Sequence, residues 1–107
     1  MHEISTIPEL RAWLAEARLT GQRVALVPTM GALHEGHLSL IDAAKARAEA
    51  VVLSVFVNPL QFGPQEDFTR YPRKLAADAA LAAARGADVL FAPTVEAMYA
   101  PESEIRV

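Results

Sequence analysis

The chain has 107 residues, 52% hydrophobic and 21% charged, which is typical of one soluble globular domain or of part of one. It contains no cysteine, so disulfides and cysteine-based zinc sites are excluded. Its net charge of −3 argues against a nucleic-acid surface. We expect a cytoplasmic protein without a membrane span, because no leader opens the chain and no apolar run reaches about 18 residues.

The first predicted element is a helix that starts after Thr6 and stops near Gly21. Thr6 and Glu9 have the spacing of a capping box, and a glycine suits the helix end. Trp13 lies in the apolar stripe of this helix and is interpreted as a packing residue. His2 precedes the helix, in what we expect to be a frayed terminus.

Three short apolar runs predict strands at residues 24–27, 51–57 and 87–93, and helical patterns cover residues 36–50 and 74–86. The first run ends at Pro28 and is expected to be covered on both faces. The order α-β-α-β-α-β predicts an α/β fold: a Rossmann-like parallel sheet with flanking helices. The final residues, "PESEIRV", start an extended pattern and stop, so we expect the sheet to be incomplete at the C-terminus.

Ligands of such sheets bind outside the carboxyl ends of the strands. Three segments follow the predicted strands there: "PTMGALHEGH", "NPLQFGPQ" and "PTVEAMY". The first contains two of the three histidines of the chain, His34 and His37, separated by Glu35 and Gly36. A helix that starts near Gly36 points free backbone N–H groups and its positive dipole end at this spot. The segment therefore predicts an anion site, suited to stabilising charge on the α-phosphate of a nucleotide under attack.

Three other interpretations of the histidine pair remain open. The pair could bind zinc, although its spacing differs from the His-Glu-x-x-His of zinc proteases, and we assign no residue to a metal. The histidines could merely cap or decorate a helix start. A dinucleotide-binding loop would need a Gly-x-Gly-x-x-Gly that the segment lacks. We interpret Glu35 as a solvated residue at a favourable helix N-terminus.

At this point the residues form a recognisable pattern. "HEGH" resembles the His-x-Gly-His signature of the nucleotidylyltransferase superfamily. The longer strings "VPTMGALHEGHLSLI", "SVFVNPLQFGPQEDFTRYPR" and "FAPTVEAMY" together resemble the pantothenate synthetase (pantoate–β-alanine ligase) family over nearly the whole chain.

The resemblance implies that pantoate attacks the α-phosphate of ATP to give pantoyl adenylate, and that β-alanine then displaces AMP to give pantothenate. It implies Mg2+ with the nucleotide, a homodimer, and small molecules rather than nucleic acid or membrane as partners. By motif position, His34 and His37 are catalytic, with His37 the expected proton donor to pyrophosphate. The ATP-binding residues are Met30, Gly31, Ala32, Leu33, His34, Glu35, Gly36 and His37, and those for pantoate and β-alanine are Gln61, Asn58 and Thr29. Asn58 could equally serve turn chemistry before proline.

The chain departs from the family in length, since family chains are more than twice as long. We therefore interpret residues 1–107 as the N-terminal part of the ATP- and pantoate-binding domain, without the rest of that domain or the C-terminal domain. Three alternatives remain open: a non-catalytic ATP- or pantoate-binding module, a structural fragment, or a related adenylyltransferase with another acid substrate.

Overall fold

The structure, a computed structural model, describes residues 1–56 and 75–94. Strands and helices alternate along the chain: β1 (His2–Ile4), α1 (Ile7–Leu19), β2 (Val24–Thr29), α2 (Glu35–Arg47), β3 (Ala50–Val55), α3 (Leu75–Ala84) and β4 (Val89–Phe91). None of these helices is long and apolar enough to cross a membrane.

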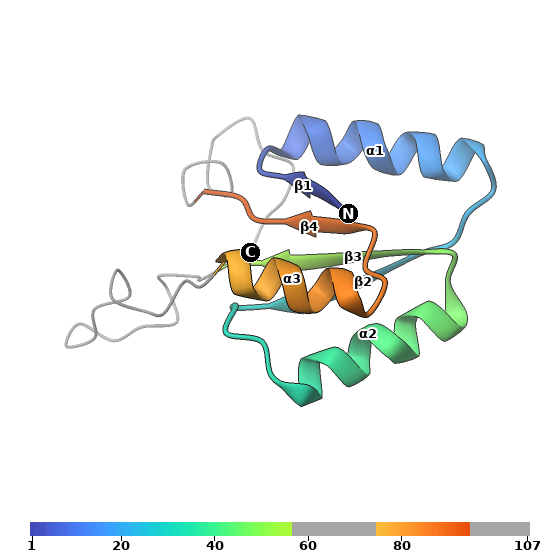
Figure 1. Cartoon of the computed structure of the whole chain (residues 1–107). Coiled ribbons are helices and arrows are strands. Elements are labelled where there is room, and N and C mark those ends of the chain that lie inside the picture. The colour runs from blue at the N-terminus through green and yellow to red at the C-terminus, as the bar shows by residue number, and fades with distance from the viewer. Residues whose placement is uncertain (57–74, 95–107) are drawn as a thin grey trace.

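The four strands form one parallel sheet in the order β1-β4-β3-β2. The connection from β1 to β2 crosses the whole sheet, and the chain then returns strand by strand through β3 to β4. Right-handed crossovers in opposite directions put their helices on opposite faces. Accordingly, α1 covers one face, while α2 and α3 cover the other (Figure 1). The predicted α/β fold with a parallel sheet and flanking helices is confirmed.

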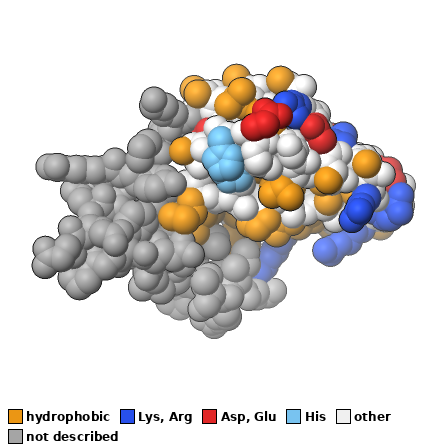
Figure 2. All heavy atoms as spheres, turned by 90° about the horizontal axis from the view of Figure 1, so that it is seen from below, with side chains coloured by type: hydrophobic (Ala, Val, Ile, Leu, Met, Phe, Trp, Pro, Cys, Tyr) orange, Lys and Arg blue, Asp and Glu red, His pale blue; other side chains and the backbone are white. Residues whose placement is uncertain are grey.

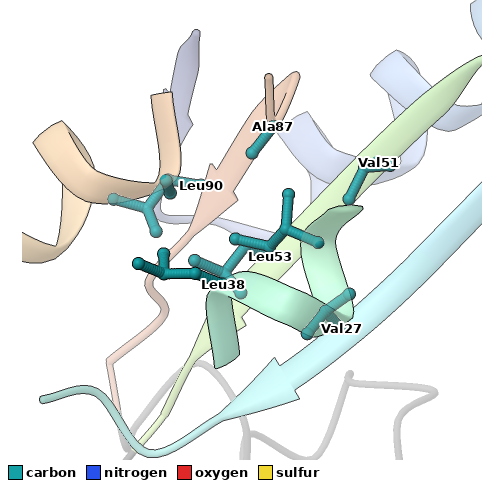
Figure 3. Close-up of a cluster of buried hydrophobic side chains, with 8 residues drawn as sticks. Val27, Leu38, Val51, Leu53, Ala87 and Leu90 are labelled. Carbon is teal, nitrogen blue, oxygen red and sulfur yellow. The ribbon is translucent and has the colours of Figure 1, made fainter. Parts of the chain in front are cut away.

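Alternating side chains of the central strands build two separate cores. Val51 and Leu53 of β3 face α2 and α3, where they meet Leu90 of β4 (Figure 3). Val52 points to the opposite face and packs in the cluster that α1 covers, where Trp13 is a half-buried member as predicted. This alternation follows from the two-residue repeat of a strand, and burial on both faces explains the continuous apolar sequence of β3.

Three predictions about the first strands are wrong. His2 is not in a frayed terminus: it starts β1, which pairs with β4 in the register His2↔Val89. The strand predicted to end at Pro28 continues through it to Thr29. Proline lacks an N–H but is tolerated in β2, because β2 is an edge strand of this sheet. Leu26 of β2 is 61% exposed, so the expectation that this strand is covered on both faces is wrong.

The remaining boundaries shift by a few residues from those predicted. The second helix ends at Arg47 rather than at residue 50, since Ala50 already pairs with Val24 as the first residue of β3. Gly21 and Gly86 follow α1 and α3 with φ angles of +79° and +91°, the left-handed geometry expected of glycine after a helix. Residue 57 of the predicted strand 51–57 and residue 74 of the predicted helix 74–86 lie outside the described residues. The same holds for "PESEIRV" at the end of the chain.

Candidate active site at the carboxyl edge of the sheet

The loop between β2 and α2 starts at the carboxyl edge of the sheet, where Thr29 pairs in register with Val55. The Thr29 hydroxyl donates a hydrogen bond to the carbonyl of Ser54 at 2.9 Å and accepts one from the N–H of Gly31 at 3.2 Å. The same side chain thus ties the loop to the neighbouring strand and starts its turn.

The loop then passes through two left-handed residues, Gly31 at φ +90° and Ala32 at φ +52°. Gly31 is also crowded, because a Cβ atom there would lie 3.2 Å from a methyl group of Val55 and 3.4 Å from the Asp78 carboxylate. Ala32 adopts this backbone despite its Cβ, which costs roughly 1–2 kcal/mol. Surrounding contacts must therefore hold the loop in this shape.

Asp78 of α3 supplies the strongest of those contacts. Its side chain is the only buried charged group in the described residues, with 3% exposure. One carboxylate oxygen accepts the N–H of Ala32 at 3.0 Å, and the other accepts the N–H of Leu33 at 2.9 Å. Hydrogen bonds to a charged acceptor are worth more than neutral ones, so this pair offsets the strain at Ala32.

His34 and His37 cap the N-terminus of α2 reciprocally. Nδ1 of His34 accepts the N–H of Gly36 at 3.1 Å, and Nδ1 of His37 accepts the N–H of His34 at 3.2 Å. The histidines therefore do cap the helix, as one interpretation of the sequence held. They also use two of the backbone N–H groups that we had expected to be free for an anion.

The caps fix which nitrogen of each ring faces outward. Because both Nδ1 atoms accept hydrogen bonds, the neutral rings carry their proton on Nε2. The ring centroids are 4.1 Å apart, and Figure 2 shows the histidine side chains as one patch at the surface. Partial burial, and then the charge of His34, lower the pKa of His37, although Asp78 opposes this. With Nδ1 of each ring engaged in the cap, the patch presents one Nε2–H donor from each of two closely spaced rings.

Gly36 is required here for space rather than for its φ angle. A Cβ atom at this position would lie 2.9 Å from Cε1 and 3.1 Å from Nδ1 of His34. Any larger residue would therefore push the His34 ring from its capping position. The glycine of the "HEGH" motif and its first histidine form one structural unit.

Arg85, just after α3, pairs with two carboxylates of α2. Its guanidinium lies 3.0 Å from the Glu35 carboxylate and also pairs with Asp42. These two acidic neighbours raise the pKa of Arg85. Glu35 is 75% exposed, as expected of a residue at a helix N-terminus, but it has an ion-pair partner that the sequence did not indicate.

The structure brings most of the predicted ATP-binding residues together at one edge of the sheet. Met30 and Leu33 are half-buried, with Leu33 packed against the core. Gly31 and Ala32 lie on the path from Thr29 to the histidines, and Glu35 and Gly36 lie between the two histidines. Asn58 and Gln61 lie outside the described residues. In the part of the chain that the structure describes, no three His, Asp or Glu side chains cluster as a metal site.

Sequence reasoning missed Asp78 and Arg85, which support the loop and the start of α2 from α3. One signal was available: Asp78 is the only charged residue in the helix "LAADAALAAA". A charge on an otherwise apolar helix seldom stays buried unless it has partners.

Comparison with known proteins agrees with this arrangement. The family model described as pantoate-beta-alanine ligase matches residues 2–107. The chain belongs to this family. The resemblance noted from the sequence is thereby confirmed.

Over the aligned region, relatives in the pantoate–β-alanine ligase family are identical to the chain at more than half of the positions. It is 57% identical over 95 residues to the pantothenate synthetase of Pelotomaculum thermopropionicum, covering 89% of the chain and 34% of that protein. It is 59% identical over 102 residues to that of Acidothermus cellulolyticus, covering 95% and 33%. The chain therefore spans about a third of the length of these relatives.

Solved structures show the same fold. A crystal structure of pantothenate synthetase from Thermus thermophilus superposes with a TM-score of 0.85 at 52% identity, covering 100% of the chain and 37% of that protein. Pantoate-beta-alanine ligase from Francisella tularensis, complexed with beta-gamma ATP and beta-alanine, superposes with a TM-score of 0.84 at 37% identity, covering 99% and 40%.

Proposed function

We propose that this chain forms the first part of an enzyme that condenses (R)-pantoate with β-alanine at the expense of ATP. In the first step, a pantoate carboxylate oxygen bonds to the α-phosphorus of ATP and pyrophosphate leaves. In the second, the amine of β-alanine attacks the acyl carbon of pantoyl adenylate, the amide forms, and AMP leaves. The observation that supports this best is the pair of outward Nε2–H groups at the carboxyl edge, in a chain of the ligase family.

In this proposal His34 and His37 act on the phosphates of ATP. Neutral imidazoles donate hydrogen bonds from Nε2 without the desolvation cost of a buried charge. A bound triphosphate, being strongly negative, would raise the pKa of His37 from its lowered value in the free protein. ATP binding would thereby favour the protonated ring, whose Nδ1 would release the N–H of His34 and whose Nε2–H could pass its proton to the departing pyrophosphate.

The other roles rest on the family motifs. Residues 30–37 would form the ATP-binding loop, in which Gly31 leaves room for Val55 and Asp78 and Gly36 leaves room for the His34 ring. Asn58, Gln61 and Thr29 would bind pantoate and place β-alanine. The Thr29 hydroxyl, already tied to Ser54 and Gly31, would do so from a fixed position. Mg2+ would arrive with the phosphates as part of the substrate.

For the 107 residues by themselves, the geometry favours ATP binding without full turnover. The contacts that shape the loop come from Thr29, Ser54 and Asp78, all within the chain. We therefore propose that residues 1–107 are the N-terminal part of the nucleotide-binding domain. We further propose, on the family resemblance, a cytoplasmic homodimer that acts on small molecules rather than on nucleic acid or membranes.

The test is pantoate-dependent exchange of pyrophosphate into ATP by this chain, alongside calorimetric titration with Mg-ATP. We expect saturable ATP binding that His37→Ala weakens. His2→Ala is the matched control, since His2 is an exposed histidine at the start of β1, and its binding should equal that of the wild type.

Exchange that requires pantoate and is lost in His37→Ala would extend the proposal to the first chemical step. Exchange with other carboxylic acids in preference to pantoate would favour a related adenylyltransferase instead. Absence of ATP binding by the wild-type chain would contradict the proposed ATP site and leave a structural fragment.

A further inference from the structure

The α2–α3 face of the sheet contains one charged side chain that the proposed reaction does not use. Asp78 is 3% exposed and lies on α3, a helix distant in sequence from the histidine loop. Burial of a carboxylate is costly unless hydrogen bonds compensate for the lost water. Here both oxygens are occupied, by the N–H groups of Ala32 and Leu33 at 3.0 and 2.9 Å.

The two N–H groups that Asp78 binds are consecutive, whereas consecutive N–H groups of an extended strand point to opposite sides. The left-handed conformations of Gly31 and Ala32 turn them toward the same point and create an anion-binding concavity. In this chain the concavity is filled by a carboxylate of the protein itself. A glycine suits position 31, because a Cβ atom there would lie only 3.4 Å from the Asp78 carboxylate that fills the concavity.

The two hydrogen bonds from Ala32 and Leu33 to Asp78, here called the Asp78 tether, lie directly beside the histidine cap. Leu33, whose N–H binds Asp78, precedes the N-cap residue His34, whose own N–H binds His37. Thus three consecutive backbone N–H groups, of residues 32 to 34, are each held by a side chain. A shift of the loop would move both imidazoles together.

We propose that Asp78 is a positioning residue for the nucleotide, holding the loop so that the Nε2 atoms of His34 and His37 face the phosphates. This inference rests on the proposed function and adds to it a residue outside the family motifs quoted above. Asp78 does not itself contact the phosphates in this scheme, because it is buried and an ionised carboxylate has no proton to donate to a phosphate oxygen.

The test compares Asp78→Asn with Asp88→Asn in this chain. Asp88 is a matched control because its carboxylate also accepts a backbone N–H, from Val51 at 2.8 Å, but at the opposite edge of the sheet. An asparagine at position 78 keeps the shape and one acceptor, yet turns an NH2 group toward the second loop N–H. We expect the Kd for Mg-ATP to rise about tenfold in Asp78→Asn, since the loop loses a hydrogen bond to a charged acceptor, and one such bond contributes about this much. It should change less than twofold in Asp88→Asn.

A second measurement tests the hydrogen bonds of Asp78 to Ala32 and Leu33 in the absence of ATP. Amide hydrogen exchange measured by NMR should show Ala32 and Leu33 protected in the wild type and less protected in Asp78→Asn. If that variant does not fold, wild-type exchange still decides, because unprotected Ala32 and Leu33 amides would overturn the proposal.

The outcomes separate this inference from the proposed function. If the wild-type chain does not bind ATP, both the proposed ATP site and the positioning role of Asp78 are overturned. ATP bound equally well by wild type and folded Asp78→Asn would overturn the positioning role alone. A lower melting temperature for both aspartate variants, with unchanged Kd values, would mean that Asp78 is only structural.

Discussion

Carboxylates hold backbone N–H groups at both ends of the parallel sheet, but at the amino end they are exposed and paired with cations, whereas at the carboxyl end the carboxylate is buried. At the amino end, Glu49 accepts the N–H of Arg23 at 2.7 Å, and Asp88 accepts that of Val51 at 2.8 Å. Each of these carboxylates also has a cation beside it: the Arg23 guanidinium at 3.0 Å and the Lys45 ammonium at 3.3 Å. Both pairs are partly or largely exposed to water.

At the carboxyl end, Asp78 is buried and its acceptor bonds go to backbone N–H groups only, among the contacts of the described residues. The loop that it holds is left-handed at two residues and leads into two histidines. The amino end closes turns between regular elements with exposed ion pairs of small individual value. The carboxyl end maintains a conformation that the chain would not adopt without support, and the difference indicates where binding geometry rather than general stability is maintained.

The largest effect is expected from Gly31→Ala, measured against Gly21→Ala. Both glycines have positive φ angles, +90° and +79°, so each alanine should cost about 1–2 kcal/mol for its left-handed backbone. Only at Gly31 does the new Cβ also meet other atoms, Val55 and Asp78, whereas nothing lies within 4 Å at Gly21. Urea unfolding should therefore show a greater loss of unfolding free energy for Gly31→Ala, together with weaker ATP binding. Equal losses would mean that the carboxyl-end loop is no more constrained than an ordinary helix end.

A smaller effect on stability is expected from Gly36→Ala, with a clear effect on binding. Alanine favours a helix over glycine by about 1 kcal/mol, but its Cβ would displace the His34 ring and remove a cap of similar value. The unfolding free energy should change by less than about 1 kcal/mol, while the Kd for ATP rises several-fold. Calorimetric titration measures the second quantity, and an unchanged Kd would show that the position of His34 is unimportant for ATP.

The smallest effects are on the pH dependence of folding stability, where the carboxyl and amino ends of the sheet contribute in different pH ranges. The folded chain lowers the pKa of His37 through burial and the charge of His34, so the unfolded chain binds a proton more readily. Stability contributed there is present above about pH 6.5 and is lost as the pH falls through the folded pKa of His37. Hydrogen bonds from Arg23 lower the pKa of Glu49 from 4.5 to about 2, so the amino-end contribution is present above pH 4.5 and is lost toward pH 2.

Urea midpoints measured across pH 7.5 to 2 should therefore fall in two stages. His37→Asn should remove the upper stage, and Glu49→Gln the lower one. A single stage that both substitutions abolish would show that the two ends do not titrate independently.

Sequence patterns predicted the parts of the fold that depend on local periodicity. The continuous apolar run of β3 and the helical stripe with Trp13 each determine their own element. The strand β1 was missed because it has three residues, of which only Ile4 is buried. Its formation depends on β4, and no local pattern reports a partner so distant in the chain. The sequence predicts a strand end at Pro28 because proline lacks the N–H that strand pairing needs, whereas its tolerance here depends on β2 lying at the edge of the sheet.

The candidate site divides in the same way. His34, Gly36 and His37 are close in sequence, so their motif indicated the helix N-terminus and an anion site. The separate roles of the two nitrogens in each ring, with Nδ1 for the cap and Nε2 for the outside, required coordinates. The contact of Asp78 with the loop joins residues 45 and 46 positions apart, and no spacing rule covers such a separation.

The pairing of β1 with β4 has a consequence for how the chain is made and folded. β1 precedes every other described strand in the chain, yet its partner Val89 lies in β4, the last of them. Residues 24–55 can assemble β2, α2 and β3 early, because those contacts are local, whereas the pairing of β1 with β4 requires a long loop to close. During synthesis the apolar face of α1 therefore has no completed sheet to cover. Folding should end, rather than begin, with the N-terminal residues.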